Sequence, residues 1–177
     1  KSDASVYYFA SSDKERVTKS IDKEEICAIG NHTIVTREQV QMYTKFYEIT
    51  YDKTLSEKKA IAYAKERNAL YVAAMQNGYQ VTDGQVKAYV EELKQNLDGI
   101  WTKEQKEKLL SGFASEDDYW AFEQKVYRID LPIQNYVRDK ENEFNRKNES
   151  GQTWDEAFKT LKQNLVDEQQ YKDSSSY

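Results

Sequence analysis

Residues 56–98 constrain the fold most, because they hold two amphipathic repeats separated by a short corner. The first repeat, Glu57–Asn77, places apolar residues three and four apart, as one face of a helix requires. Gly78 follows, where glycine accepts the left-handed conformation that ends a helix. Thr82 and Gln85 then have the spacing of a capping box that starts a second helix. We therefore expect a helical hairpin at the centre of the molecule.

The composition predicts that the domain around this hairpin is also mostly α-helical. The chain has 177 residues, which suits one domain. Charged residues make up 32% of it, and the mean hydropathy is −0.95, as expected for helices with one apolar stripe and wide solvated faces. Six glycines and one proline are too few for the many tight turns of a β-sandwich.

The charge balance bears on partners and location. The net charge of −5 at pH 7 disfavours nucleic acid and anionic membrane surfaces, since both require a basic face. No stretch approaches the roughly 18 apolar residues that span a bilayer. The sequence begins at Lys1 without methionine. We expect this after removal of a signal segment or membrane anchor, although a cloned fragment would begin in the same way.

The N-terminal part contains the clearest β-signal. Residues 1–24 have the composition of a flexible tail, with the alternative that Val6–Ala10 adds an edge strand. Residues 25–36 read as a hairpin whose corner, Asn31 and His32, requires positive φ. A lone hairpin is marginally stable, so it must pack on helices or gain a third strand.

Capping residues divide the remaining chain into helices. Thr36 starts a helix over residues 37–50 that is apolar on two faces. It either lies deep in the core or shows one face to a partner. Ser115 starts the longest helix, which Pro132 must kink or split near Asp130. Residues 145–152 are a polar break, Thr153 starts the final helix, and residues 171–177 read as a tail.

Catalytic chemistry finds little support in the sequence. Cys27 lies in an apolar strand and His32 at a turn, and no third group orients the histidine. The sequence contains no glycine-rich phosphate loop, no nucleophile elbow and no calcium loop. We therefore expect a protein that is not an enzyme and that binds no metal or other cofactor.

The aromatic content is the strongest pointer to binding. The chain has 14 Tyr, 6 Phe and 3 Trp residues, and Tyr and Trp offer large contact areas at low entropy cost. Two interpretations stay open: these residues line an apolar cleft, or they fill the core. The candidates for a cleft are Tyr43, Phe46, Tyr47, Tyr119 and Trp120.

Two segments carry a family resemblance. Residues 28–36, AIGNHTIVT, follow the pattern of an apolar strand, a turn and Ile-Thr. Residues 74–86, AMQNGYQVTDGQV, follow the pattern Ala-x-x-x-Gly-apolar-x-Val-Thr-Asp-x-x-Val. With the short and long helices after them, they resemble the N-terminal chaperone region of the SurA/PrsA family of extracytoplasmic foldases, over residues 25–170. The resemblance depends on capping and turn residues, chiefly Thr36, Gly78, Thr82 and Pro132.

The chain departs from the family in two places. His32 stands where the family usually has the glycine of the turn. Family members also insert a parvulin-type prolyl isomerase domain of about 90 residues between the long and last helices. Here residues 145–152 leave no room for it, so isomerase activity is not expected.

The resemblance implies an orthogonal multi-helix array like the SurA N-terminal domain, with a short N-terminal β-hairpin and a C-terminal helix that folds back. It implies a non-enzymatic chaperone that binds unfolded or extended segments of exported proteins. The alternative is an interaction domain that kept the fold and binds one partner or self-associates. The expected location is the bacterial cell envelope, secreted or tethered as a lipoprotein, with membrane contact only through a removed N-terminal anchor.

Overall fold

The structure is a computed structural model that describes residues 7–8, 10–147 and 151–174. The described chain is mostly helical, as predicted. Its elements, in order, are α1 (Ser11–Lys19), a 3₁₀ turn (Lys23–Glu25), β1 (Ile26–Ile29), β2 (Ile34–Thr36), α2 (Arg37–Tyr51), α3 (Glu57–Gln76), α4 (Asp83–Asp98), α5 (Lys103–Leu110), α6 (Glu116–Lys147), α7 (Trp154–Gln169) and β3 (Lys172–Asp173).

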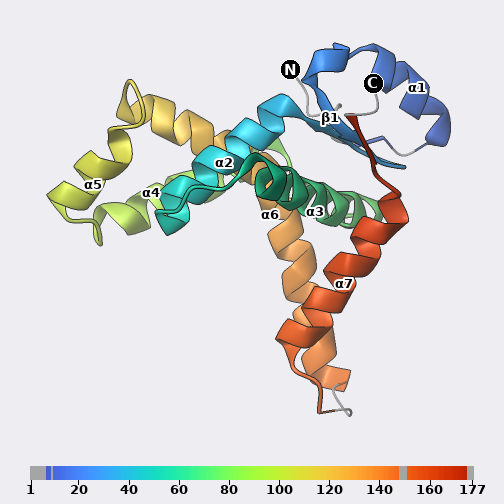
Figure 1. The fold of residues 1–177 in the computed structure, drawn as a ribbon. Helices are drawn as coiled ribbons and strands as arrows, with labels where there is room; N and C mark the ends of the chain where they lie inside the picture. Colours follow the sequence, from blue (N-terminus) through green and yellow to red (C-terminus); the bar gives the residue numbers. More distant parts are fainter. Residues whose placement is uncertain (1–6, 9, 148–150, 175–177) are drawn as a thin grey trace.

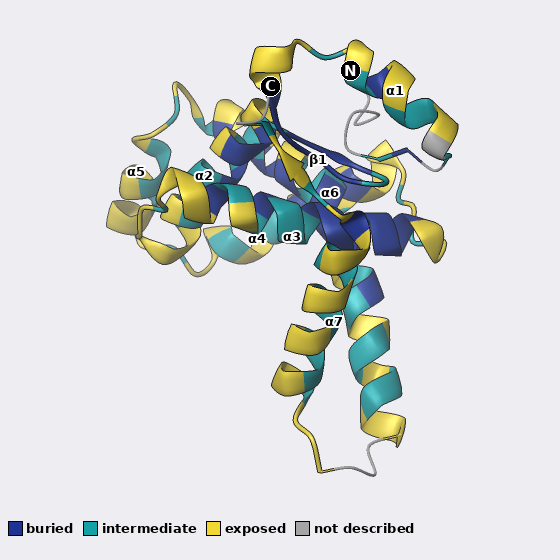
Figure 2. Cartoon of the chain, turned by 45° about the vertical axis from the view of Figure 1, so that its right-hand side comes forward, coloured by how far each residue is buried: buried dark blue, intermediate teal, exposed yellow. Residues whose placement is uncertain are grey.

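Helix α3 lies at the centre of the molecule. Figure 1 shows it between the sheet on one side and the descending pair α6 and α7 on the other. Its buried face contains five alanines, whose small side chains let neighbouring helices approach closely: Ala60, Ala64, Ala69, Ala73 and Ala74. In Figure 2 the dark, buried residues gather on α3 and the sheet, whereas the distal parts of α6 and α7 are half-buried or exposed.

Two adjacent polar residues of α3 bind different neighbours. Asn68 is fully buried and forms a reciprocal amide pair with Gln39 of α2, with N···O distances of 2.8 and 2.9 Å. It also donates to the Ile34 carbonyl of β2 at 3.3 Å. Arg67 donates to the Asp130 carboxylate of α6 at 2.8 Å. These bonds join α3 to α2, the sheet and α6.

The hairpin forms where the sequence predicts it, but its corner differs. Gly30 N–H donates to the Thr33 carbonyl at 2.8 Å, which closes the turn around Asn31 and His32. Neither residue has positive φ, so that expectation is wrong. The hairpin gains a third strand, because β3 pairs antiparallel with β1 and gives the order β2-β1-β3.

Most helix caps follow the predicted spacing. Thr82 with Gln85 forms the complete capping box that the sequence predicts, and Thr102 with Gln105 forms a second one at the start of α5. Gly78 has φ +83° just after α3, the left-handed conformation that we expected there. Thr36 caps α2, but the Gln39 side chain pairs with Asn68 instead of reaching back to the cap.

Helix α6 runs through Pro132 without a break. The two halves of the helix follow different directions in Figure 1. A kink is the expected result, since proline removes one backbone hydrogen bond and its ring crowds the preceding turn. Of the two alternatives for this helix, the kink is the one that forms.

The interpretation of residues 1–24 as a flexible tail is wrong for the described residues. Helix α1 forms within it, and Tyr8 and Val17 are buried against the outer face of the hairpin. Tyr8 N–H donates to the His32 carbonyl at 3.0 Å, and its hydroxyl donates to the Gly30 carbonyl. Tyr7 and Tyr8 form no strand, and Val6 and Phe9 lie outside the described residues.

The interpretation of residues 171–177 as a tail is also wrong where they are described. Lys172 and Asp173 form β3, and Tyr171 donates its hydroxyl hydrogen to the Lys65 carbonyl at 2.7 Å. Just before them, the Gln169 carbonyl accepts from the Asn31 N–H at 2.8 Å. Tyr8 and Gln169 are therefore both bound at the turn of the hairpin.

We predict that the Asn68→Leu variant lowers the free energy of unfolding by about 2–3 kcal/mol, because it leaves the buried amide of Gln39 unpaired. Adding Gln39→Met should recover about 1 kcal/mol or more, since the double variant leaves neither side-chain amide unpaired. Urea denaturation measures both changes. A double variant no more stable than Asn68→Leu would show that the amide pair does not hold this junction.

Candidate functional site

Three of the five aromatic residues proposed for a cleft are buried. The exposed fraction is 0% for Tyr43, 3% for Tyr119 and 7% for Trp120. The core interpretation is therefore correct for these three, and they offer no surface to a ligand in this conformation. Phe46 and Tyr47 are half-buried on α2.

Four of the five residues divide between two aromatic clusters. Tyr43 and Tyr47 meet the ring of Tyr63 edge-on, with centroid distances of 5.4 and 6.2 Å. Tyr119 and Trp120 instead pack with Trp101 of the loop after α4. The single aromatic cleft that we expected is therefore not formed by these residues.

Charged and polar contacts join α2 to α5 and α6. Lys45 donates to the Gly112 carbonyl at 3.1 Å, and its ammonium lies 3.8 Å from the centroid of the Phe113 ring. The ends of α2 make ion pairs with the same neighbours, Glu38 with Lys125 at 3.6 Å and Asp52 with Lys108 at 3.2 Å. Glu38 and Lys45 are seven residues apart in α2, so they share one helix face, and Asp52 directly follows the last residue of the helix.

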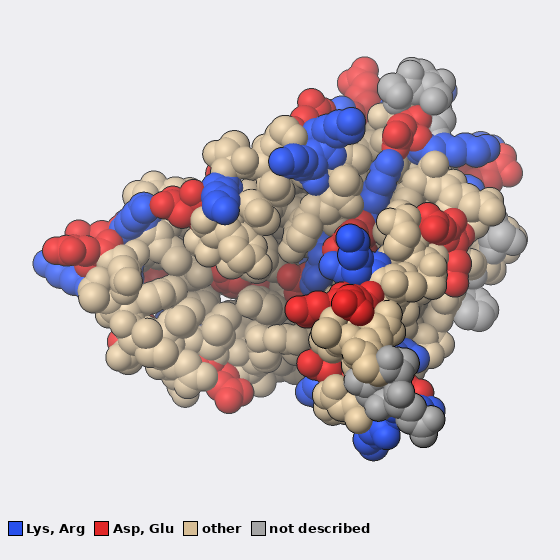
Figure 3. Space-filling model, turned by 60° about the horizontal axis from the view of Figure 1, so that its bottom comes forward, with Lys and Arg blue, Asp and Glu red and all other residues tan. Residues whose placement is uncertain are grey.

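Phe46 lies between the two packed faces of α2. At about 100° per residue, it falls between Tyr43, which faces α3, and the face that carries Lys45. Figure 3 shows a hollow on this side of the molecule, with α2 along one wall and α4 and α6 along the other, lined largely by uncharged side chains. Of the five predicted residues, Phe46 and Tyr47 are the two that keep exposed surface, both on α2.

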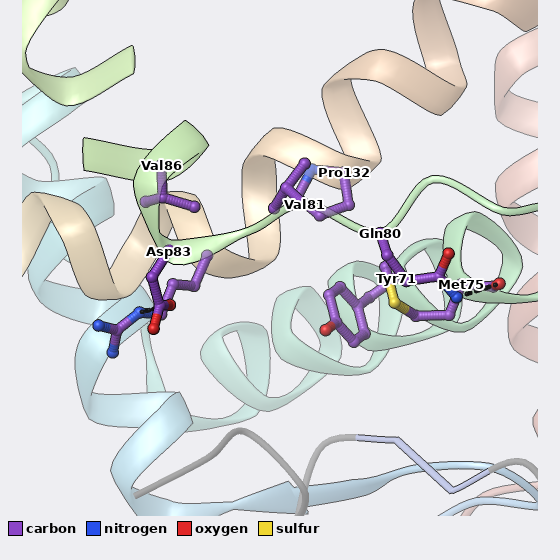
Figure 4. A pocket seen from close by; sticks show the side chains of 8 residues that line it. Tyr71, Met75, Gln80, Val81, Asp83, Val86 and Pro132 are labelled. Carbon is purple, nitrogen blue, oxygen red and sulfur yellow. Dashed lines mark hydrogen bonds and ion pairs between the residues drawn. The ribbon is translucent and has the colours of Figure 1, made fainter. Parts of the chain in front are cut away.

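A cavity of about 120 Å³ lies where α3, the corner before α4, and α6 meet. Figure 4 shows side chains from all three segments around it. The residues that line it are Tyr71, Met75, Gln80, Val81, Asp83, Val86, Arg128 and Pro132. Sequence reasoning assigned the corner and Pro132 structural roles only. The signal for a cavity was available, because a kinked helix packs imperfectly against a corner.

Glu123 is a buried carboxyl group on α6. It is 4% exposed, and its Oε2 atom has no hydrogen-bond partner among the described residues. The pKa of Glu123 is raised to about 7, chiefly by burial; a hydrogen bond with Tyr119 lowers it and the charge of Asp130 raises it, both by less. Tyr127 of α6, whose ring packs on Tyr89 of α4, lies on the same side. Glu123 therefore sits where α6 packs on α4.

The described residues give no other indication of chemistry. They contain no cluster of three or more His, Cys, Asp or Glu side chains that could hold a metal ion. Within the same residues, every helix is too short or too polar to cross a bilayer. No protein-family model, curated protein or solved structure matches the chain, so the resemblance to the SurA/PrsA family stays a prediction.

We predict that Glu123→Gln stabilises the protein at pH 8 by about 2–3 kcal/mol relative to wild type. The folded state raises the pKa of this acid, so it binds the proton more tightly than the unfolded chain does. The favourable contribution is complete below the ordinary pKa of 4.5 and is lost as the pH rises to about 7. A permanently neutral glutamine removes this loss.

Chemical denaturation at pH 4.5 and pH 8 tests the prediction. The free energy of unfolding of Glu123→Gln should exceed that of wild type by much more at pH 8 than at pH 4.5. Glu104→Gln, at an exposed position of α5, is the matched control and should follow the wild-type profile. If Glu123→Gln also follows that profile, the carboxyl group does not titrate as stated.

Proposed function

We propose that this protein is a non-enzymatic, chaperone-like module that binds unfolded or extended segments of other polypeptides. The observation that carries the proposal is the hollow between α2 and the α4–α6 region, lined largely by uncharged side chains. Phe46 of α2, which is half-buried, is the residue that we propose to contact a bound segment there. Apolar surface in a concave site is where an unfolded segment gains most from leaving water.

The residues at the edge of this hollow suit reversible binding. Lys45 and the two ion pairs hold α2 against α5 and α6, and the pairs Asp52–Lys108 and Glu38–Lys125 are largely exposed. Exposed pairs of this kind contribute about 0–1 kcal/mol each. A segment could therefore displace them at low cost and widen the hollow.

The resemblance to SurA/PrsA foldases supports the same function and an extracytoplasmic location in the bacterial cell envelope. The position of residues 145–152 agrees with the resemblance, because Lys147 and Gly151 lie at the distal end of the α6–α7 pair. This is the junction at which the family carries its isomerase domain.

An interaction domain with one dedicated partner is the second candidate. The distal end of the α6–α7 pair favours it, because Phe144, Trp154 and Phe158 stack there at 5.3–5.7 Å while remaining only half-buried. Such a surface would bind a partner or a second copy rather than many clients.

Aggregation of a chemically unfolded client tests the first candidate. We expect the wild-type protein to suppress aggregation at an equimolar ratio, and Phe46→Ser to require about tenfold more protein, as for the loss of a central aromatic contact. Tyr51→Ser removes an exposed aromatic residue from the same helix and should behave as wild type. Circular dichroism confirms that each variant is folded.

Two outcomes would count against the proposal. Absence of suppression by the folded wild-type protein would contradict the chaperone function and leave the interaction domain. Suppression that survives Phe46→Ser would keep the function and exclude this part of the hollow as the binding surface.

A further inference from the structure

The cavity beside Pro132 has polar and apolar walls in similar measure, and its apolar part comes from three segments. Met75 and Tyr71 contribute from α3, Val81 and Val86 from the corner and α4, and Pro132 from α6. Its volume of about 120 Å³ is close to that of engineered apolar cavities of about 150 Å³ that bind benzene. One branched aliphatic side chain fits a space of this size, whereas an indole ring exceeds it.

Arg128 supplies a hydrogen-bond donor at the cavity. Its side chain belongs to the lining, and its Nε atom is buried with no acceptor among the described residues. The nearest carboxylate oxygen, Oδ1 of Asp83, is 3.5 Å from Nε and makes an ion pair without hydrogen-bond geometry. A buried N–H without an acceptor is costly, so a ligand that offers an oxygen is favoured.

The kink changes the backbone at the same place. Pro132 has no N–H and cannot donate to the carbonyl of Arg128, four residues earlier in α6. The ring of Pro132 lines the cavity. A peptide group presents one C=O and one N–H, so its C=O can accept from the Arg128 Nε–H.

We propose that this cavity binds one aliphatic side chain of an extended polypeptide, with the adjoining peptide group hydrogen-bonded at Arg128. Asp83 already balances the charge of Arg128, which favours a neutral peptide group over a free carboxylate. The identity of the natural ligand rests on the proposed function, because a chaperone client provides such segments. Binding of a small probe to the cavity can be measured independently of aggregation suppression.

The test uses N-acetyl-L-leucinamide as the probe, which carries one aliphatic side chain between two peptide groups. Titration into the ¹⁵N-labelled full chain should shift the amide resonances of residues 81–86 and 128–133 in a saturable manner. N-acetylglycinamide, which lacks the side chain, should produce no saturable shifts. N-acetyl-L-leucine, with a free carboxylate, should bind more weakly than the amide.

Variants locate the site. Val81→Phe fills the cavity from the corner and should abolish binding, whereas Ile100→Phe makes a similar change at an exposed loop position and should bind as wild type. Arg128→Met should weaken binding about fivefold, the value expected for one net hydrogen bond. Circular dichroism and the undisturbed resonances of α7 establish that the variants are folded.

The results separate the two proposals. Saturable shifts at the cavity that Val81→Phe removes would support the subsite, even if the protein suppressed no aggregation. No saturable shift with the folded wild-type protein, or binding that persists in folded Val81→Phe, would overturn the subsite. Suppression of aggregation would then still support the chaperone function at the hollow.

Discussion

The buried contacts of Arg67 and Asn68 hold the molecule together around α3. Asn68 fixes the distance and the rotation of α2 and β2 relative to α3, because its amide must meet both Gln39 and the Ile34 carbonyl. Arg67 fixes α6 by the pair with Asp130, whose side chain is 10% exposed. Polar groups at such depth tolerate few alternative arrangements, so they select one packing of helices whose alanine faces would accept several.

Local interactions explain which parts of the fold were predictable. Thr82 with Gln85, and Gly78 at the end of α3, act within a few residues, so the sequence pattern contains the whole interaction. Gln39 shows the limit of this reasoning. Its spacing from Thr36 suits a capping box, but Asn68 lies 29 residues further along and offers its side chain two hydrogen bonds inside the core. Tertiary contacts overrode the local pattern there.

The errors at the two ends have the same physical origin. Tyr8 is held by the carbonyls of the hairpin turn, and β3 forms only because β1 offers it an edge to pair with, while neither segment has a long apolar repeat of its own. The aromatic residues of the site depended on distant partners in the same way. Tyr43 and Phe46 are three residues apart in α2 and equally aromatic, yet Tyr43 faces α3 and is buried while Phe46 is only half-buried. Only the arrangement of the helices distinguishes them.

Pro132 lies near the middle of α6, between two parts of the molecule that pack differently. Buried hydrogen bonds and apolar contacts join α3 to the sheet, α2 and α7. The region of α4, α5 and the first half of α6 has its own apolar cluster, against which Ile49 of α2 packs, and Lys45 and exposed ion pairs add polar contacts with α2. The Arg67–Asp130 pair joins the two parts beside Pro132, where α6 has lost a backbone hydrogen bond and bends most easily.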